Sequence, residues 1–168
     1  MVIYSSNLLL LTAVTIVETH FYVRYQIEFM GLTYATIELI NQYDEYKSED
    51  GEIAITEIRR WTGNVLVDTG AIRLAINVEI RDQLGLRKGE MISVALADGS
   101  KVLIEIIGGI KIRFGNRHSF VDAFVLKGNT EPLLGCIPLE EMDLIVIPEE
   151  NKLEYNHKEY DGGLYSLK

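Results

Sequence analysis

Short runs of alternating apolar and polar residues make up most of this sequence, and turn-forming residues separate the runs. Alternation with a period of two is typical of strands that bury one face. A continuous apolar run at residues 65–67 predicts a buried strand. The predicted strands span residues 32–40, 53–61, 65–67, 72–76, 91–96, 101–107, 110–114, 117–126, 144–147 and 152–155.

Helical signals are confined to two short segments. Asn77 is a helix-capping residue, and two apolar residues four positions apart precede Gly85, which would end the helical turn. Pro138 suits the first turn of a second short helix. With many strands and little helix, the sequence predicts an all-β fold, a closed or nearly closed barrel with one or two short helices.

Polar stretches and glycine pairs mark where we expect the chain to leave the sheet. Residues 41–52 are rich in charge and predict a solvated loop. Gly108-Gly109 predicts a break in the sheet, and Gly115-Asn116 predicts a hairpin turn. Ala97-Asp98-Gly99-Ser100 lies between two alternating runs, and an Asp-Gly pair in that position is a strong hairpin signal.

The candidate chemistry lies at the end of the apolar run. There the chain continues as Asp68-Thr69-Gly70-Ala71. Gly70 has no Cβ and allows a sharp turn, which would hold the Asp68 carboxylate at the mouth of the core. Taken alone, three such residues favour an ordinary turn, because short motifs often occur by chance.

The N-terminal segment, residues 1–29, is an extension with three interpretations. Its apolar centre at residues 8–17 is shorter than the ~18 apolar residues expected of a membrane-spanning helix. No Lys or Arg precedes that centre, and no clear cleavage site follows, as a signal peptide would require. A weak membrane or export segment, an extra strand and a start at Met30 all stay open, and we favour the start at Met30.

Composition narrows the possible partners. The 168 residues are 48% hydrophobic, enough for one domain with its own core. The formal net charge of -9 argues against nucleic acid as a partner. The single Cys136 excludes an internal disulfide, and neither Cys136 nor an isolated His118 predicts a metal site. We expect a cytoplasmic protein without metal or cofactor, and membrane association only if residues 8–17 direct it.

Two motifs together resemble the paired signature of the retropepsin-like (clan AA) aspartic proteases. They are Leu66-Val67-Asp68-Thr69-Gly70-Ala71 and, later in the chain, Leu133-Leu134-Gly135. The hairpin at residues 97–100 follows Asp68 by about thirty positions, where these proteases carry their flap. The resemblance covers roughly residues 30–157 and is greatest to the small single-domain bacterial members, which leaves residues 158–168 as a polar tail.

The resemblance implies an endopeptidase that is a homodimer. Peptide hydrolysis by carboxylates needs one ionised and one protonated group, and this chain supplies only one Asp-Thr-Gly. Asp68 from each of two subunits would complete the pair, with an acidic pH optimum. By the resemblance, Thr69 would brace the partner subunit, Gly70 would allow close approach, and Ala71 would contact a peptide or protein substrate.

The resemblance also implies supporting roles for the other motifs. Ala97, Asp98, Gly99 and Ser100 would form a flap that closes over the peptide. Leu133, Leu134 and Gly135 would pack beneath the Asp68 loop in a structural role. The alternative is a catalytically weak dimeric module on the same fold that binds peptides or supports assembly.

Overall fold

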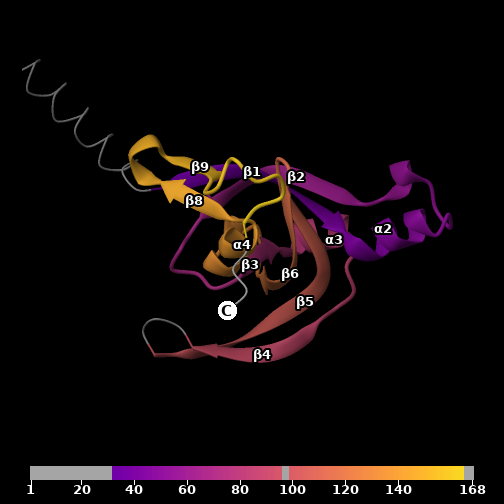
Figure 1. Cartoon of the computed structure of the whole chain (residues 1–168). Coiled ribbons are helices and arrows are strands. Elements are labelled where there is room, and N and C mark those ends of the chain that lie inside the picture. Colours follow the sequence, from indigo (N-terminus) through magenta and orange to yellow (C-terminus); the bar gives the residue numbers. More distant parts are fainter. Residues whose placement is uncertain (1–31, 96–98, 165–168) are drawn as a thin grey trace, which may run out of the picture. The chain divides into compact units, whose positions relative to one another are not determined.

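The structure, a computed structural model, describes residues 32–95 and 99–164 (Figure 1). Strands predominate in this part of the chain, which confirms the predicted β-rich class. Its strands are β1 Thr33–Asn41, β2 Arg60–Val67, β3 Leu74–Asn77, β4 Glu90–Ala95, β5 Lys101–Phe114, β6 Arg117–Leu126, β7 Leu133–Leu134, β8 Leu144–Ile147 and β9 Lys152–Tyr155.

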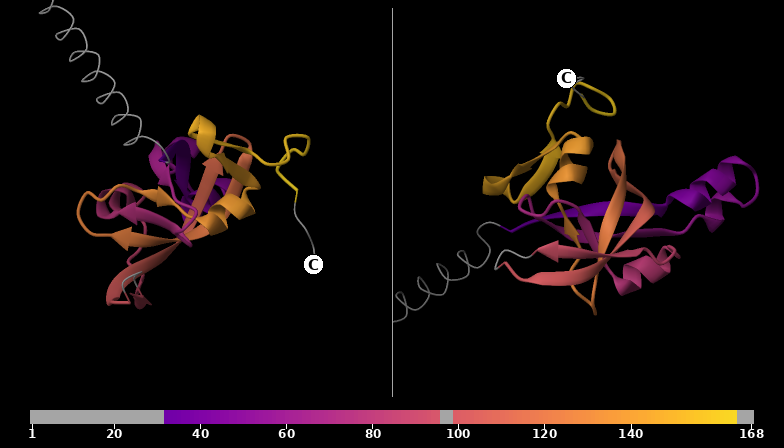
Figure 2. Two further views of the ribbon diagram at one scale, coloured as in Figure 1. Left: turned by 90° about the vertical axis from the view of Figure 1, so that its left-hand side faces the viewer. Right: turned by 90° about the horizontal axis from the view of Figure 1, so that it is seen from below.

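Seven of these strands form one sheet that turns back on itself. The order is β1-β2-β7-β3-β6-β5-β4, and β5 pairs in addition with β1. The second half of β5 makes this pairing, from Glu38↔Arg113 to Asn41↔Ile110. Hydrogen-bonded neighbours therefore lead from β1 through five other strands and back to β1, while β4 projects with the first half of β5 as a hairpin (Figure 2).

Alternating burial along the strands places the core on the inner face of this circuit. The burial of β6 alternates residue by residue, as expected of a strand with one face in the core. β3 differs, because all four of its residues are buried, although alternation at residues 72–76 predicted a half-buried strand. The fully buried apolar side chains include Leu39, Val65, Leu74, Ile76, Ile110, Ile112 and Leu134.

β5 continues through the glycine pair that was expected to break the sheet. The register with β6 shifts between Ile107 and Ile110, which makes the pair a β-bulge. Gly109 has a φ of 81°, and a Cβ at this position would lie 2.4 Å from the Tyr43 ring. The prediction of a break was wrong because a bulge lets one strand bend and pair with new neighbours without ending.

The charged segment after β1 is a helix, α2 Gln42–Glu49, where a solvated loop was predicted. The side chain of Asn41 caps it by accepting hydrogen bonds from the N–H groups of Tyr43 and Asp44. Asp44 is buried and accepts from the Arg59 guanidinium at 2.7 Å through each of its two oxygens. This hydrogen bonding lowers the pKa of Asp44 despite the opposing effect of burial. Long-range partners, rather than apolar periodicity, therefore hold α2.

Residues 53–59 do not form the predicted strand, since β2 begins only at Arg60. The segment instead contains a 3-10 turn, η1 Ile55–Glu57, and Ile55 is 71% exposed. Of the isoleucines that produced the alternation, only Ile58 is buried. The Glu57 side chain accepts a hydrogen bond from the Ala54 N–H at 2.7 Å, which stabilises the turn locally.

Three α-helices occur in the described part of the chain, more than the one or two predicted. The two predicted helices are α3 Val78–Gln83 and α4 Cys136–Glu141, and α2 is the one that was not predicted. A second 3-10 turn is η2 Pro148–Glu150. The predicted cap of α3 is confirmed, because Asn77 Oδ1 accepts from the Ile80 N–H at 2.9 Å. Gly85 follows α3 with a φ of 60°, as expected of a residue that ends a helix.

The C-terminal segment is anchored on a buried aspartate. β8 and β9 form a separate two-stranded sheet, and Asp143 lies just before β8. Its carboxylate contacts His157 Nδ1 at 2.9 Å and accepts from the Leu164 N–H at 3.1 Å. The fully buried Arg117 guanidinium lies 4.0 Å from Asp143 and over the Tyr155 ring. These contacts tie residues 155–164 to β6.

The three interpretations of residues 1–29 lie outside the described residues, as do Ala97 and Asp98 of the hairpin tip. Within residues 32–95 and 99–164, no helix is long and apolar enough to cross a membrane.

Candidate functional site

Asp68 lies at the turn that leaves β2, as predicted, and its side chain is half-buried. The Gly70 N–H donates a hydrogen bond to Asp68 Oδ1 at 2.9 Å, and the Ala71 N–H donates to the Asp68 carbonyl at 3.1 Å. These bonds fix the carboxylate relative to its own backbone. Oδ2 accepts no hydrogen bond from any residue that the structure describes, which leaves it available to water or to a second carboxyl group.

The turn is held in place by a strand that lies far away in the sequence. β7 pairs with β2 in parallel, through Leu66↔Leu133 and Val67↔Leu134. The carboxyl ends of parallel strands meet at the same edge, so Asp68 and Gly135 emerge side by side. The Asp68 N–H donates to the Leu134 carbonyl at 3.0 Å, which joins the two motifs directly.

The chain after Gly135 continues along the same turn. The Cys136 N–H donates to the Ala71 carbonyl at 2.8 Å, and the Ile137 N–H donates to the Ile72 carbonyl at 3.1 Å. All these contacts use backbone groups, so they fix the path of residues 68–72 without depending on particular side chains.

Gly135 allows this close approach because it has no side chain. A Cβ at this position would lie 2.5 Å from the Arg73 carbonyl oxygen and 2.7 Å from that of Ala71. Its φ of -86° is ordinary, so space rather than backbone conformation requires the glycine. Gly70 is less constrained, since a Cβ there would meet only Asp68 Oδ1, at 3.2 Å.

Of the predicted flap residues, only Gly99 and Ser100 lie in the described part of the chain. Both are exposed and directly precede β5, and Gly99 has a φ of 82°. The flanking strands pair from Glu90↔Ile106 to Ala95↔Lys101, which confirms the predicted hairpin.

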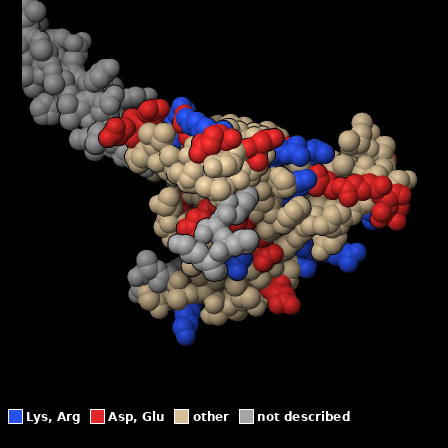
Figure 3. All heavy atoms as spheres, viewed as in Figure 1, with Lys and Arg blue, Asp and Glu red and all other residues tan. Residues whose placement is uncertain are grey.

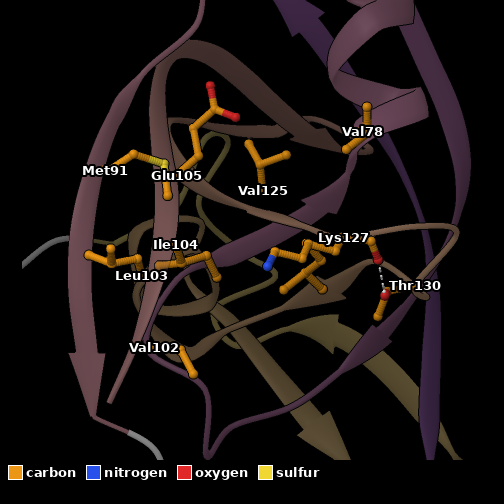
Figure 4. A pocket seen from close by; sticks show the side chains of 10 residues that line it. Val78, Met91, Val102, Leu103, Ile104, Glu105, Val125, Lys127 and Thr130 are labelled. Carbon is orange, nitrogen blue, oxygen red and sulfur yellow. Dashed lines mark hydrogen bonds between the residues drawn. The ribbon is translucent and has the colours of Figure 1, made fainter.

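A cavity of ≈ 410 Å³ lies between this hairpin and the turn that follows β6 (Figure 4). Its lining is mainly aliphatic, with contributions from α3, β4, β5 and β6. Three polar residues also reach it, namely Glu105, Lys127 and Thr130. The aliphatic side chains include Val78, Met91, Val102, Leu103, Ile104 and Val125.

No sequence motif predicts a function for the residues of this cavity. Residues 127–130 were expected as a turn, which is confirmed, but the direction of Lys127 could not be inferred from it. The cavity forms only where β4 and β5 face the end of β6, so no local pattern identifies it. The apolar run at residues 102–104 was the available signal, but it does not show that these side chains line a cavity.

Of the two other Asp-Gly sequences, Asp98 lies outside the described residues, and Asp161 does not join Asp68. Asp161 lies in the C-terminal segment, where its carboxylate accepts a hydrogen bond from Asn116 at 2.7 Å. Within the residues described, no group of three or more His, Cys, Asp or Glu side chains could hold a metal ion. In the part of the chain that the structure describes, Asp68 is the carboxylate that this turn carries.

No protein-family model matches the sequence, and no curated protein matches it. Among solved structures, the chain is similar to the EIAV protease complexed with the inhibitor HBY-793. The identity is 22% and the TM-score 0.38, and the match covers 48% of this chain and 76% of that one. We therefore base the proposal below on the geometry of the chain itself.

Proposed function

We propose that this protein is an aspartic-type endopeptidase that acts as a homodimer, with Asp68 of each subunit forming the catalytic pair. The observation that carries this proposal is the Asp68 turn. Its carboxylate is fixed through Oδ1 by the Gly70 N–H, and the turn is bonded along its backbone to the segment at Leu134–Ile137. Such rigidity suits a group that must meet a second carboxylate within about 3 Å.

The proposed reaction needs only water and the two carboxyl groups. The ionised Asp68 takes a proton from water, whose oxygen then attacks the peptide carbonyl carbon. The protonated Asp68 of the other subunit donates a hydrogen bond to the carbonyl oxygen. As the C–N bond breaks, a proton passes to the leaving amine. No metal or organic cofactor takes part in this scheme.

Several features support a second copy of the chain as the partner. Each chain supplies one Asp-Thr-Gly, and Thr69 is exposed beside Asp68, where its hydroxyl would reach the other subunit. Ile72 directly follows this turn and is 62% exposed, an apolar side chain that a partner would cover. β8 pairs only with β9 among the described strands, so one of its edges is available to another chain.

The surface charge fits a peptide partner better than nucleic acid. Acidic side chains gather over the end of α2 and the turn after it, where Glu49, Asp50 and Glu52 are exposed (Figure 3). Phosphate groups would be repelled by such a surface.

The first test is cleavage of an unstructured protein from pH 3 to pH 7 by the wild type and by Asp68→Asn. Asparagine keeps the size of the side chain but cannot exchange the proton. We expect activity with an acidic optimum in the wild type and none in Asp68→Asn. Asp50→Asn, at an exposed aspartate beyond α2, is the matched control and should keep full activity.

Mixed subunits test whether the site is shared. With wild type and Asp68→Asn mixed equally and allowed to exchange, only dimers of two wild-type subunits would be active. Activity would then fall to about a quarter of that of the same total amount of wild type. A fall to only about half would mean that each chain works alone, which contradicts the proposal. Peptide binding without any cleavage by the wild type would instead support the binding module.

A further inference from the structure

The cavity under the hairpin carries an uncompensated positive charge. Two of its polar residues are charged, Glu105 and Lys127. Glu105 is already neutralised, because Oε2 accepts from Arg81 Nη1 and Oε1 from the Gly89 N–H, both at 2.9 Å. The Glu105 and Arg81 side chains are only 16% and 15% exposed, so this ion pair is a largely buried, structural part of the cavity lining.

Lys127 has no comparable partner. Its ammonium group contacts no acidic side chain among the described residues, and Figure 4 shows it reaching across the cavity toward Ile104. The figure also shows the carboxylate of Glu105 pointing away from it. Lys127 as a whole is exposed, and its ammonium group lies beside the aliphatic lining at the rim of the cavity. Beside such a lining an ammonium group gains more from an anionic ligand than one in open solvent.

The backbone that carries Lys127 is well fixed. The Thr130 hydroxyl donates to the Lys127 carbonyl at 2.7 Å, and Asn77 Nδ2 donates to the Thr130 carbonyl at 3.1 Å. Gly128 supplies the positive φ of 67° that the turn needs. Lys127 therefore starts from a defined position at the rim, and its flexible stem directs the charge inward.

We propose that this cavity selects a glutamate side chain in the bound peptide. Its methylene groups would lie against Ile104 and Val125, and its carboxylate would accept a hydrogen bond from Lys127 Nζ. Glutamate has the aliphatic stem that this lining favours, whereas aspartate has one methylene fewer. This inference rests on the proposed function, because it takes the ligand to be a peptide held beneath the hairpin.

The test uses two peptide series that differ only in Glu against Gln at each position around a cleaved bond. The cleaved bond is taken from the digest of the unstructured protein. For the wild type we expect kcat/KM about 5- to 10-fold higher with Glu at one position, the gain of one charge-assisted hydrogen bond at a partly exposed site. Lys127→Met keeps the stem and removes the charge, so the preference should disappear. Lys127→Glu should invert it, and Lys47→Met, on the exposed face of α2, should leave it unchanged.

The preference should also depend on pH. A glutamate side chain of the peptide ionises near pH ~4.3. The ratio of Glu to Gln cleavage should therefore rise between pH 4 and pH 6. A ratio that is constant over this range, or that survives in Lys127→Met, overturns the inference while leaving the peptidase function intact.

Binding separates this inference from the peptidase proposal. Fluorescently labelled Glu and Gln peptides are titrated with Asp68→Asn, alone and combined with Lys127→Met. For this arm the labelled peptides are fragments of the same unstructured protein, so it needs no prior cleavage. Tighter binding of Glu peptides that depends on Lys127 supports the site even if the wild type cleaves nothing. Equal binding of both peptides by both proteins rejects it.

Discussion

Replacing Gly135 by alanine should destabilise the fold and inactivate the site together. The added Cβ would lie 2.5 Å from the Arg73 carbonyl oxygen, 2.7 Å from the Ala71 carbonyl oxygen and 2.7 Å from the Arg73 nitrogen. Real Cβ atoms do not approach backbone this closely, and no flexible side chain is present to yield. One of the two segments must therefore move.

The cost can be assembled from two contributions. Overpacking in a closely fitted interior costs about 1–3 kcal/mol. The Ala71 carbonyl also accepts the hydrogen bond from Cys136 at 2.8 Å, and losing this bond adds about 1 kcal/mol. We expect the free energy of unfolding to fall by about 2–4 kcal/mol, and kcat/KM to fall further because Asp68 is displaced with the turn.

Urea unfolding at a fixed protomer concentration measures the first effect, and peptide cleavage below the unfolding midpoint measures the second. Gly128→Ala is the matched control, since Gly128 has open space around its Cα and only a positive φ. It should cost about 1–2 kcal/mol and leave the geometry at Asp68 unchanged. A Gly135→Ala protein as stable and active as the wild type would refute the described packing of the two segments.

Other substitutions probe the remaining contacts. Asp143→Asn should lower the free energy of unfolding by about 3–5 kcal/mol, because it leaves the buried Arg117 charge uncompensated. His157→Ala changes a partly exposed side chain and should lower the free energy of unfolding by only about 1 kcal/mol. Equal losses of the two variants in urea unfolding would contradict this account. Burial would raise the pKa of Asp143, but hydrogen bonds from His157, the Leu164 N–H and Asn156 outweigh it and lower the pKa. The stabilisation by Asp143 is therefore present at neutral pH and lost as the pH falls through its folded pKa, below the usual ~3.9, so the urea midpoint of the wild type should drop below about pH 4 and that of Asp143→Asn should drop less. Asn77→Ala should cost about 1–2 kcal/mol through the lost cap of α3, and it should weaken the Glu preference because the Lys127 turn loosens; an unchanged preference would mean that Asn77 does not position this turn.

Local signals in the sequence predicted the elements that local physics determines. The end of β2 at Asp68, the capped turn of α3 and the hairpin at Gly115-Asn116 each depend on a few neighbouring residues, and the structure contains all three. Strands were also predicted at residues 144–147 and 152–155, and they are present as β8 and β9, which pair with each other.

The errors occur where distant residues decide the outcome. α2 has little apolar periodicity, but Asp44 bonds to Arg59 and Glu45 lies 3.0 Å from Lys111 of β5. The Tyr43 ring lies 2.4 Å from where a Cβ of Gly109 would be, a long-range contact that no local pattern reveals. At the candidate site, the sequence predicted the position of Asp68 and its turn. That the Lys127 side chain points into the cavity depends on the packing of β5 against the end of β6, which the sequence does not reveal.

The backbone hydrogen bonds around Asp68 determine how many substitutions this part of the sequence can tolerate. Backbone groups make the contacts from Leu66 to Pro132, Asp68 to Leu134, Cys136 to Ala71 and Ile137 to Ile72. Because every residue except proline supplies the same donor and acceptor, most side chains on either segment can be exchanged without altering the turn. Only Gly135 and the three residues of the turn itself are restricted by space or chemistry. Two chains could therefore share this arrangement while agreeing at few positions.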